Sequence, residues 1–232
     1  TEIQQCAFSG AGLTSITIPN SVTTIGTDAF SRNNITTITL GSSVSSIGAG
    51  AFAGNLNLSA YIASGNSHFS TLNGVLFNTN KTTLIAYPPA AGATYTVPNT
   101  VTTIGGGAFQ GLTNLTSITL PNSVTTLGDN AFAETSSLTS ITLPNSLTTI
   151  GQTVFASSGF SSITIPDSVT TAGFGFLQTN RNLTSVTWGS GLTYIPTCTF
   201  QNSGGLATFT IPNTVTEIQQ CAFSGAGLTS IT

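Results

Sequence analysis

The chain has 232 residues, and only nine of them are charged: three Lys or Arg and six Asp or Glu. These make up 4% of the residues, against about a quarter in an ordinary soluble domain. Lys81, Arg32 and Arg181 are the only cations besides His68, so no basic patch can neutralise a run of phosphates. We therefore expect no nucleic-acid partner. We also expect no membrane insertion, because no apolar run approaches the roughly 20 residues of a membrane helix.

A repeat of 22 or 23 residues runs along the chain from its first residues. Each copy begins with Leu-x-x-Ile-x-Ile or a close variant, and a Pro or Gly follows. Apolar residues that alternate with Ser or Thr predict a half-buried strand. The Pro or Gly stands at Pro19, Gly41, Pro98, Pro121, Pro144, Pro166, Gly189 and Pro212.

The second half of each copy has apolar positions equivalent to Val22, Ile25 and Phe30, separated by Thr-Thr and by Gly-x-x-Ala. The Gly permits a tight corner that a β-carbon would obstruct. A single coil cannot offset its ordering entropy, so the coils must stack and bury continuous apolar columns. The predicted aromatic column contains Phe8, Phe30, Phe52, Phe109, Phe132, Phe155, Phe200 and Phe223.

One copy, at residues 64–97, is enlarged to 34 residues. It contains Asn73-Gly74 between β-prone residues, which is a strong signal for a hairpin with a two-residue turn. We expect this hairpin to project from the regular stack or to flank it. Asn73 and Gly74 are therefore candidate contact residues.

The pattern Leu-x-x-Ile-x-Leu-Pro-x-Ser-Val-x-x-Ile-Gly-x-x-Ala-Phe resembles the BspA-like, or Treponema pallidum-type, leucine-rich repeats. Residues 72–98 also resemble an insertion that recurs in that family. The resemblance covers nearly the whole chain. It implies a curved solenoid with a β-sheet face, secreted or displayed on microbes and often adhesive, and it supplies no ligand and no catalytic motif.

We therefore predict a repeat solenoid of the leucine-rich-repeat type, a right-handed β-rich superhelix that is continuous over residues 1–232. It should have about nine coils of 22–23 residues, with the enlarged coil inside it.

Residues 1–17 recur without a change as residues 216–232, although neighbouring repeats are much less alike. The offset of 215 residues defines a higher-order unit. We expect the chain to continue into further tandem units or to assemble head to tail into a fibre, so that its partner is itself. Recent duplication of one coil without any role in assembly, or an engineered sequence, is the alternative.

Cys198 and Cys221 occupy the same position in consecutive coils. If coils are spaced like neighbouring strands, at about 4.8 Å, the two α-carbons fall near the range that a disulfide permits, and an extracellular setting favours the bond. Cys6 repeats Cys221, so its partner would lie in a preceding unit. Free, half-buried thiols are the alternative.

The outward positions of the strand segments carry Ser or Thr. Stacked coils would align these hydroxyl groups into two ladders, a neutral surface for an extracellular matrix protein or a glycan, although β-propensity alone could explain them. Ice binding is a further alternative, because flat Ser and Thr ladders suit it. The residues are Ser15, Thr17, Thr37, Thr39, Ser117, Thr119, Ser140, Thr142, Ser162, Thr164, Ser185, Thr187, Thr208 and Thr210.

No residues suggest catalysis, a metal site or a cofactor. His68 is far from Cys198 in the chain, and a solenoid keeps such positions apart. The acidic residues are scattered, and the sequence has no Cys-x-x-Cys or His cluster. We predict a non-catalytic structural or adhesive repeat protein, extracellular or on the cell surface, and in fibre-forming or tandem form. The alternative is an adhesin that binds protein or glycan of the host or of neighbouring cells without polymerising.

Overall fold

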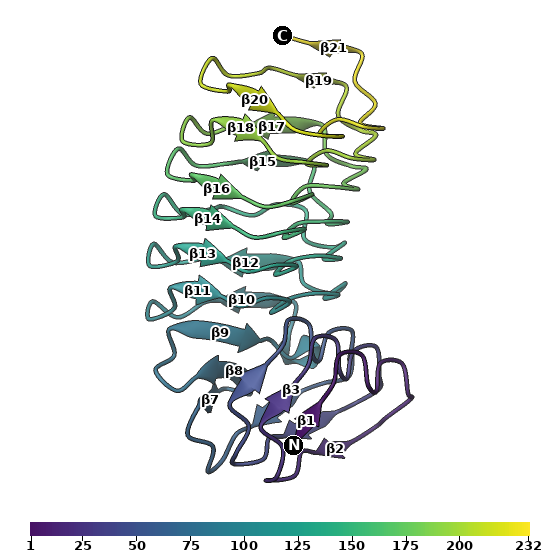
Figure 1. Ribbon diagram of the computed structural model, residues 1–232, viewed down its shortest axis with the longest axis vertical. Helices are drawn as coiled ribbons and strands as arrows, with labels where there is room; N and C mark the ends of the chain where they lie inside the picture. Colours follow the sequence, from purple (N-terminus) through teal and green to yellow (C-terminus); the bar gives the residue numbers. More distant parts are fainter.

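The computed structural model describes all residues, 1–232, and is a solenoid of short β-strands. Its only helical element is the 3₁₀ turn η1 (Pro89–Ala91). Figure 1 shows the coils stacked along the long axis of the molecule, with the two termini at opposite ends. The predicted leucine-rich-repeat solenoid is confirmed. The structure contains no helix with the length and hydrophobicity that a membrane crossing requires.

The Leu-x-x-Ile-x-Ile segments form one face, which we call the hydroxyl face. Its strands pair in parallel as β2-β4-β6, β10-β12, β15-β17 and β19-β21. Their bounds are β2 (Ile16–Thr17), β4 (Thr37–Thr39), β6 (Ala60–Ile62), β10 (Thr94–Thr96), β12 (Ser117–Thr119), β15 (Ser162–Thr164), β17 (Ser185–Thr187), β19 (Thr208–Phe209) and β21 (Ser230–Ile231). Residues 140–142 form no strand.

The Val-Thr-Thr-Ile segments form a second face, with more continuous pairing. It contains the sheets β1-β3-β5 and β18-β20 and the seven-stranded sheet β16-β14-β13-β11-β9-β8-β7. The bounds are β1 (Glu2–Ile3), β3 (Thr24–Ile25), β5 (Ser46–Ile47), β7 (Phe69–Leu72), β8 (Val75–Asn78), β9 (Thr83–Ala86), β11 (Thr103–Ile104), β13 (Thr126–Leu127), β14 (Thr149–Ile150), β16 (Thr171–Ala172), β18 (Tyr194–Ile195) and β20 (Glu217–Ile218).

The predicted aromatic column is divided into three stacked groups: Phe8, Phe30 and Phe52, then Phe109, Phe132 and Phe155, then Phe200 and Phe223. The ring centroids of Phe109 and Phe132 lie 5.0 Å apart at an interplanar angle of 5°, and those of Phe132 and Phe155 lie 5.8 Å apart at 16°. All three rings are fully buried. Phe8, at the end of the stack, is 43% exposed because no further coil covers it.

The coils form two stacks rather than one uninterrupted column. A core of 16 buried residues extends from Ile18 to Leu76, and a second core of 39 buried residues extends from Val75 to Ala226. We call residues 1–63 the N-terminal stack and residues 83–232 the C-terminal stack. Figure 1 shows the N-terminal stack tilted against the C-terminal one. The single continuous solenoid that the sequence predicts is therefore bent at the enlarged coil.

The predicted hairpin lies at this bend. Strands β7 (Phe69–Leu72) and β8 (Val75–Asn78) are antiparallel, and the two turn residues have φ of 50° at Asn73 and 79° at Gly74, as a type I′ turn requires. The hairpin does not project: the Tyr61 backbone N–H donates to the Gly74 carbonyl oxygen at 2.9 Å. Its tip therefore rests on β6, and only Asn73 of the two candidate contact residues is exposed.

Strand β8 separates the two cores, because its side chains alternate between them. Leu76 belongs to the N-terminal core, while Val75 and Phe77 belong to the C-terminal core. A strand that is buried on both faces needs consecutive apolar residues. The hairpin thus lies between the two stacks and separates them at the second face.

The two stacks touch at the opposite side, where the coil corners meet. The Gly50 backbone N–H donates to the Gly106 carbonyl oxygen at 3.3 Å. Gly50 and Gly107 both have positive φ, 62° and 66°, and a β-carbon on Gly107 would clash with the Gly50 backbone. Glycine is therefore required at this inner corner of the bend.

Candidate functional site

The hydroxyl face presents its predicted Ser and Thr residues to solvent. Only Thr37 and Thr39 are half-buried, and the others are exposed. The hydroxyl of Thr210 interacts with that of Thr232 at 3.1 Å. It is the only predicted ladder residue whose side chain is held by another protein group, so the remaining hydroxyls are free to donate to a partner and to accept from it.

The ladders are divided into groups rather than continuous. Thr17 aligns with Thr39 across β2 and β4, and Thr164 aligns with Thr187 across β15 and β17. Ser140 and Thr142 lie in the segment that forms no strand, and a surface cleft of about 340 Å³ separates it from β15. The hydroxyl face is thus a series of short patches.

The structure brings two of the three cysteines together. The Cys198 N–H donates to the Gln220 carbonyl oxygen at 3.0 Å, which stacks Cys198 on Cys221. Burial raises the pKa of the Cys198 thiol, and the charge and hydrogen bond of Cys221 raise it further. All three thiols are free, and Cys6 is exposed at the other end of the molecule. The Cys198–Cys221 disulfide stays a prediction.

A polar cleft lies at the inner corner of the bend; we call it the inner cleft. It has a volume of about 250 Å³ and contains three of the nine charged residues, Asp28, Arg32 and Glu134. The Arg32 guanidinium lies 3.8 Å from the Glu134 carboxylate, and this ion pair joins the two stacks. Burial raises the pKa of Asp28, although Arg32 lowers it in part. Gln110 completes the polar wall.

The comparison with protein families assigns this fold. The family described as "BspA type Leucine rich repeat region" has a model that matches residues 1–91 and 93–206, in six copies. The chain belongs to the BspA-type leucine-rich repeat proteins. The resemblance that the sequence suggests is confirmed. No curated protein matches the chain.

Solved structures of bacterial proteins are similar to this BspA-type chain. A leucine-rich repeat protein from Eubacterium ventriosum is 29% identical, with a TM-score of 0.77 over 98% of this chain and 68% of that one. The pneumococcal vaccine antigen PcpA is 24% identical, with a TM-score of 0.71 over 99% and 70%. The T. pallidum leucine-rich repeat protein is 20% identical, with a TM-score of 0.50 over 71% and 82%. The last two show the fold alone.

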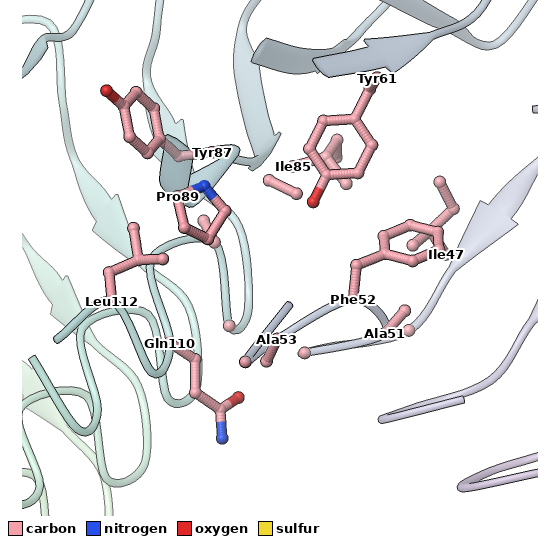
Figure 2. Close-up of a pocket in the computed structure, with 16 residues that line it drawn as sticks. Ile47, Ala51, Phe52, Ala53, Tyr61, Ile85, Tyr87, Pro89, Gln110 and Leu112 are labelled. Atoms are coloured by element: carbon pink, nitrogen blue, oxygen red, sulfur yellow. The ribbon is translucent and has the colours of Figure 1, made fainter. Parts of the chain in front are cut away.

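A small apolar cavity of about 20 Å³ lies beside the inner cleft, between the two stacks of the BspA-type solenoid. Figure 2 shows the Tyr61 hydroxyl directed into it, between Ile85 and Phe52. Tyr61 is only 3% exposed, and burial alone raises its pKa, with no hydrogen bond from the protein. We call this space the Tyr61 cavity.

The sequence does not directly predict the inner cleft or the Tyr61 cavity. Asp28 and Glu134 are distant in the chain, and only the bend brings their coils together. The aligned repeats do give an indirect signal. Each coil has two corner positions with positive φ, and in the two coils that meet at the bend both positions are glycine: Gly50 and Gly54 in one, Gly107 and Gly111 in the other.

Proposed function

We propose that this chain is a non-catalytic scaffold on the cell exterior, with a 215-residue unit that continues in tandem. Its hydroxyl face would meet extracellular protein or glycan. The observation that carries the proposal is that the same 17-residue segment occurs at both ends of the chain, each time packed on a different side.

At the N-terminus, this coil is covered by the coil that follows it. Ile3 aligns with Ile25, and the rings of Phe8 and Phe30 stack at 5.2 Å with parallel planes. The lower side of the coil is open, and Phe8 remains 43% exposed.

At the C-terminus, the identical coil is covered by the coil that precedes it. Ile218 aligns with Ile195, and the rings of Phe223 and Phe200 stack at 5.1 Å. Its upper side is open, with Ile218 47% exposed. In a tandem chain this coil would be covered on one side by the coil that precedes it at the C-terminus and on the other by the coil that follows it at the N-terminus. A tandem junction would therefore bury apolar surface that a single unit leaves in water.

A two-unit chain tests this proposal: residues 1–215 followed directly by residues 1–232. The control joins two copies of residues 1–232 by a flexible Gly-Ser linker. Small-angle X-ray scattering should show one extended rigid particle for the direct fusion and a distribution of shapes for the control. The junction should also resist proteolysis only in the direct fusion. Equal flexibility and equal cleavage of the two chains would refute the tandem stack.

The free hydroxyls favour an adhesive role for the same scaffold. A binding surface of this kind should lose its partners when bulky charge is placed on it, so we suggest Thr164→Lys with Thr187→Lys. Thr170→Lys, exposed on a different segment of the same coil, is the control. Binding would be measured on a glycan array and on purified matrix proteins. Binding that both variants retain equally would exclude the hydroxyl face.

Ice binding is not proposed. It needs one regular array of hydroxyls, whereas the hydroxyl face is divided into separate sheets.

A further inference from the structure

The two copies of the 17-residue segment differ in what lies beneath them. The copy at residues 216–232 rests on the coil formed by residues 193–215, whereas the copy at residues 1–17 leaves the same lower side open. The sequences are identical. A group on the lower side that is buried or hydrogen-bonded only in the C-terminal copy is therefore a group that the coil beneath it binds.

Two alanines show the difference in burial. Ala222 and Ala226, in the C-terminal copy, are only 3% and 2% exposed. Their counterparts in the N-terminal copy, Ala7 and Ala11, are exposed. Because the local sequence is the same, the cover supplied by residues 193–215 is what removes these methyl groups from water.

The backbone shows the same difference. In the C-terminal copy, the carbonyl oxygens of Gln220, Ala222 and Ser224 accept from N–H groups of the coil beneath at 2.7–3.0 Å. The N–H groups of Gln219 and Thr229 donate back to that coil at 2.9 and 2.8 Å. The five equivalent groups of the N-terminal copy form no hydrogen bond, so they remain free to bind a coil of the same kind. They belong to Gln4, Gln5, Ala7, Ser9 and Thr14.

Strand edges and one aromatic ring complete this contact. The C-terminal copy is held by parallel pairing of β20 with β18 and of β21 with β19, and the rings of Phe223 and Phe200 lie 5.1 Å apart. In the N-terminal copy, β1 pairs only with β3 and β2 only with β4, so each strand keeps one free edge. A free strand edge is a template for pairing with another chain.

We propose that residues 193–215 form a docking surface for residues 1–17 of a second copy of this chain, in competition with the chain's own residues 216–232. This inference rests on the junction proposed above and adds that the junction also forms between separate chains. The termini lie at opposite ends of the molecule (Figure 1), so copies add head to tail. The attached segment has an effective concentration on the order of 1 mM. It therefore holds the docking surface in dilute solution until it is displaced.

The test uses full-length chains in which the two parts of the contact are changed separately. In the open chain, a flexible Gly-Ser sequence of equal length replaces residues 216–232 and frees the docking surface. Ala7→Asp places a carboxylate on the side that docking would bury, and it leaves folding intact because Ala7 is exposed. The open chain with A7D thus offers only the docking surface, and the unchanged chain offers only its N-terminal coil.

Sedimentation velocity should show a one-to-one complex when these two chains are mixed, and single chains for each of them alone. The open chain without A7D offers both parts, so it should form head-to-tail oligomers whose size rises with concentration. The matched control mixes the open A7D chain with the unchanged chain carrying A7D. Its binding should be at least about tenfold weaker, because the buried carboxylate has no partner.

Two further measurements keep the result independent of folding. The fluorescence of Trp188, which lies in the C-terminal core, reports whether the open chain remains folded there. Ala222→Asp is a second way to free the docking surface, since it places a carboxylate at a buried position of the chain's own segment. Combined with A7D, it should give the same one-to-one complex with the unchanged chain.

The proposal is overturned if the folded open A7D chain and the unchanged chain stay separate at high micromolar concentration. It is also overturned if A7D in the unchanged chain leaves the complex as strong as before. The two-unit chain distinguishes this failure from failure of the tandem stack. A rigid two-unit chain without binding between separate chains would confine the junction to one polypeptide, whereas a flexible two-unit chain would remove both proposals.

Discussion

Truncation of Phe132 tests whether the aromatic column stabilises the solenoid. The ring is fully buried and stacked between Phe109 and Phe155. Removal of a buried Phe ring costs about 3–5 kcal/mol, because the side chain loses its transfer free energy and leaves a cavity. Two stacked neighbours place F132A in the upper half of this range, since each aromatic pair adds about 0.5–1.5 kcal/mol beyond the buried area.

The chain contains its own control for this change. Leu177 occupies the corresponding column position two coils later and is also fully buried. Phe132→Leu should therefore cost much less, about 1–1.5 kcal/mol, because most of the volume stays. Phe8→Ala, at the half-exposed end of the column, should cost less than F132A for the same chemical change.

The assay is urea unfolding followed by circular dichroism and by the fluorescence of Trp188. This is the only tryptophan; it is 7% exposed, and its indole N–H donates to the Leu192 carbonyl oxygen at 3.1 Å. It therefore reports on the C-terminal core. A loss below about 1 kcal/mol for F132A, or equal losses for F132A and F132L, would refute the column as a main source of stability. Both signals should change together, as two-state unfolding requires.

Three further predictions follow from other parts of the chain. Oxidised glutathione should join Cys198 to Cys221 by thiol–disulfide exchange, measured by mass spectrometry of non-reduced peptides; recovery of both thiols in free form would contradict the pairing. Asn180→Ala should cost about 3 kcal/mol in urea unfolding, because the amide donates to two buried carbonyl oxygens at 2.9 Å and accepts from the Ser158 N–H at 2.8 Å. Burial and the charge of a neighbouring tyrosine raise the pKa of Tyr95 to about 12. The folded protein thus favours neutral Tyr95, and stability should fall as pH rises from 10 towards 12. The phenolate absorbance of Tyr95, taken as the difference between the unchanged chain and Tyr95→Phe, should appear only on unfolding. Titration of Tyr95 itself near pH 10 in the folded protein would contradict this.

The repeat and its strands could be predicted because they follow from the alternation of apolar and polar residues. The hairpin could be predicted from Asn73-Gly74, since a type I′ turn needs positive φ at both positions. Each of these features is local in the sequence. The buried side-chain amides such as Asn33 and Asn55, which donate to carbonyl oxygens of two coils, escaped prediction because Asn looks like a turn residue.

The bend could not be predicted, because it depends on how one strand serves two cores. The consecutive apolar residues Val75, Leu76 and Phe77 were the available signal. Alternating apolar and polar residues would indicate a strand with one solvent-exposed face, whereas a run of apolar residues indicates burial on both faces. Even so, the run does not specify the angle between the stacks, which is set by the hairpin on one side and by the contact of Gly50 with Gly107 on the other.

Departures from a repeat are informative because the repeat itself explains every position that conforms to it. Stacking requires the same apolar and hydroxyl residues in each coil, but it does not require charge. Three of only nine charged residues nonetheless gather in the inner cleft, from coils that belong to different stacks. The exposed ion pair between Arg32 and Glu134 adds at most about 1 kcal/mol, so stability is a weak reason for its presence. The pair instead marks the bend, because it joins coils of the two stacks beside the corner where Gly50 and Gly107 let their backbones approach closely.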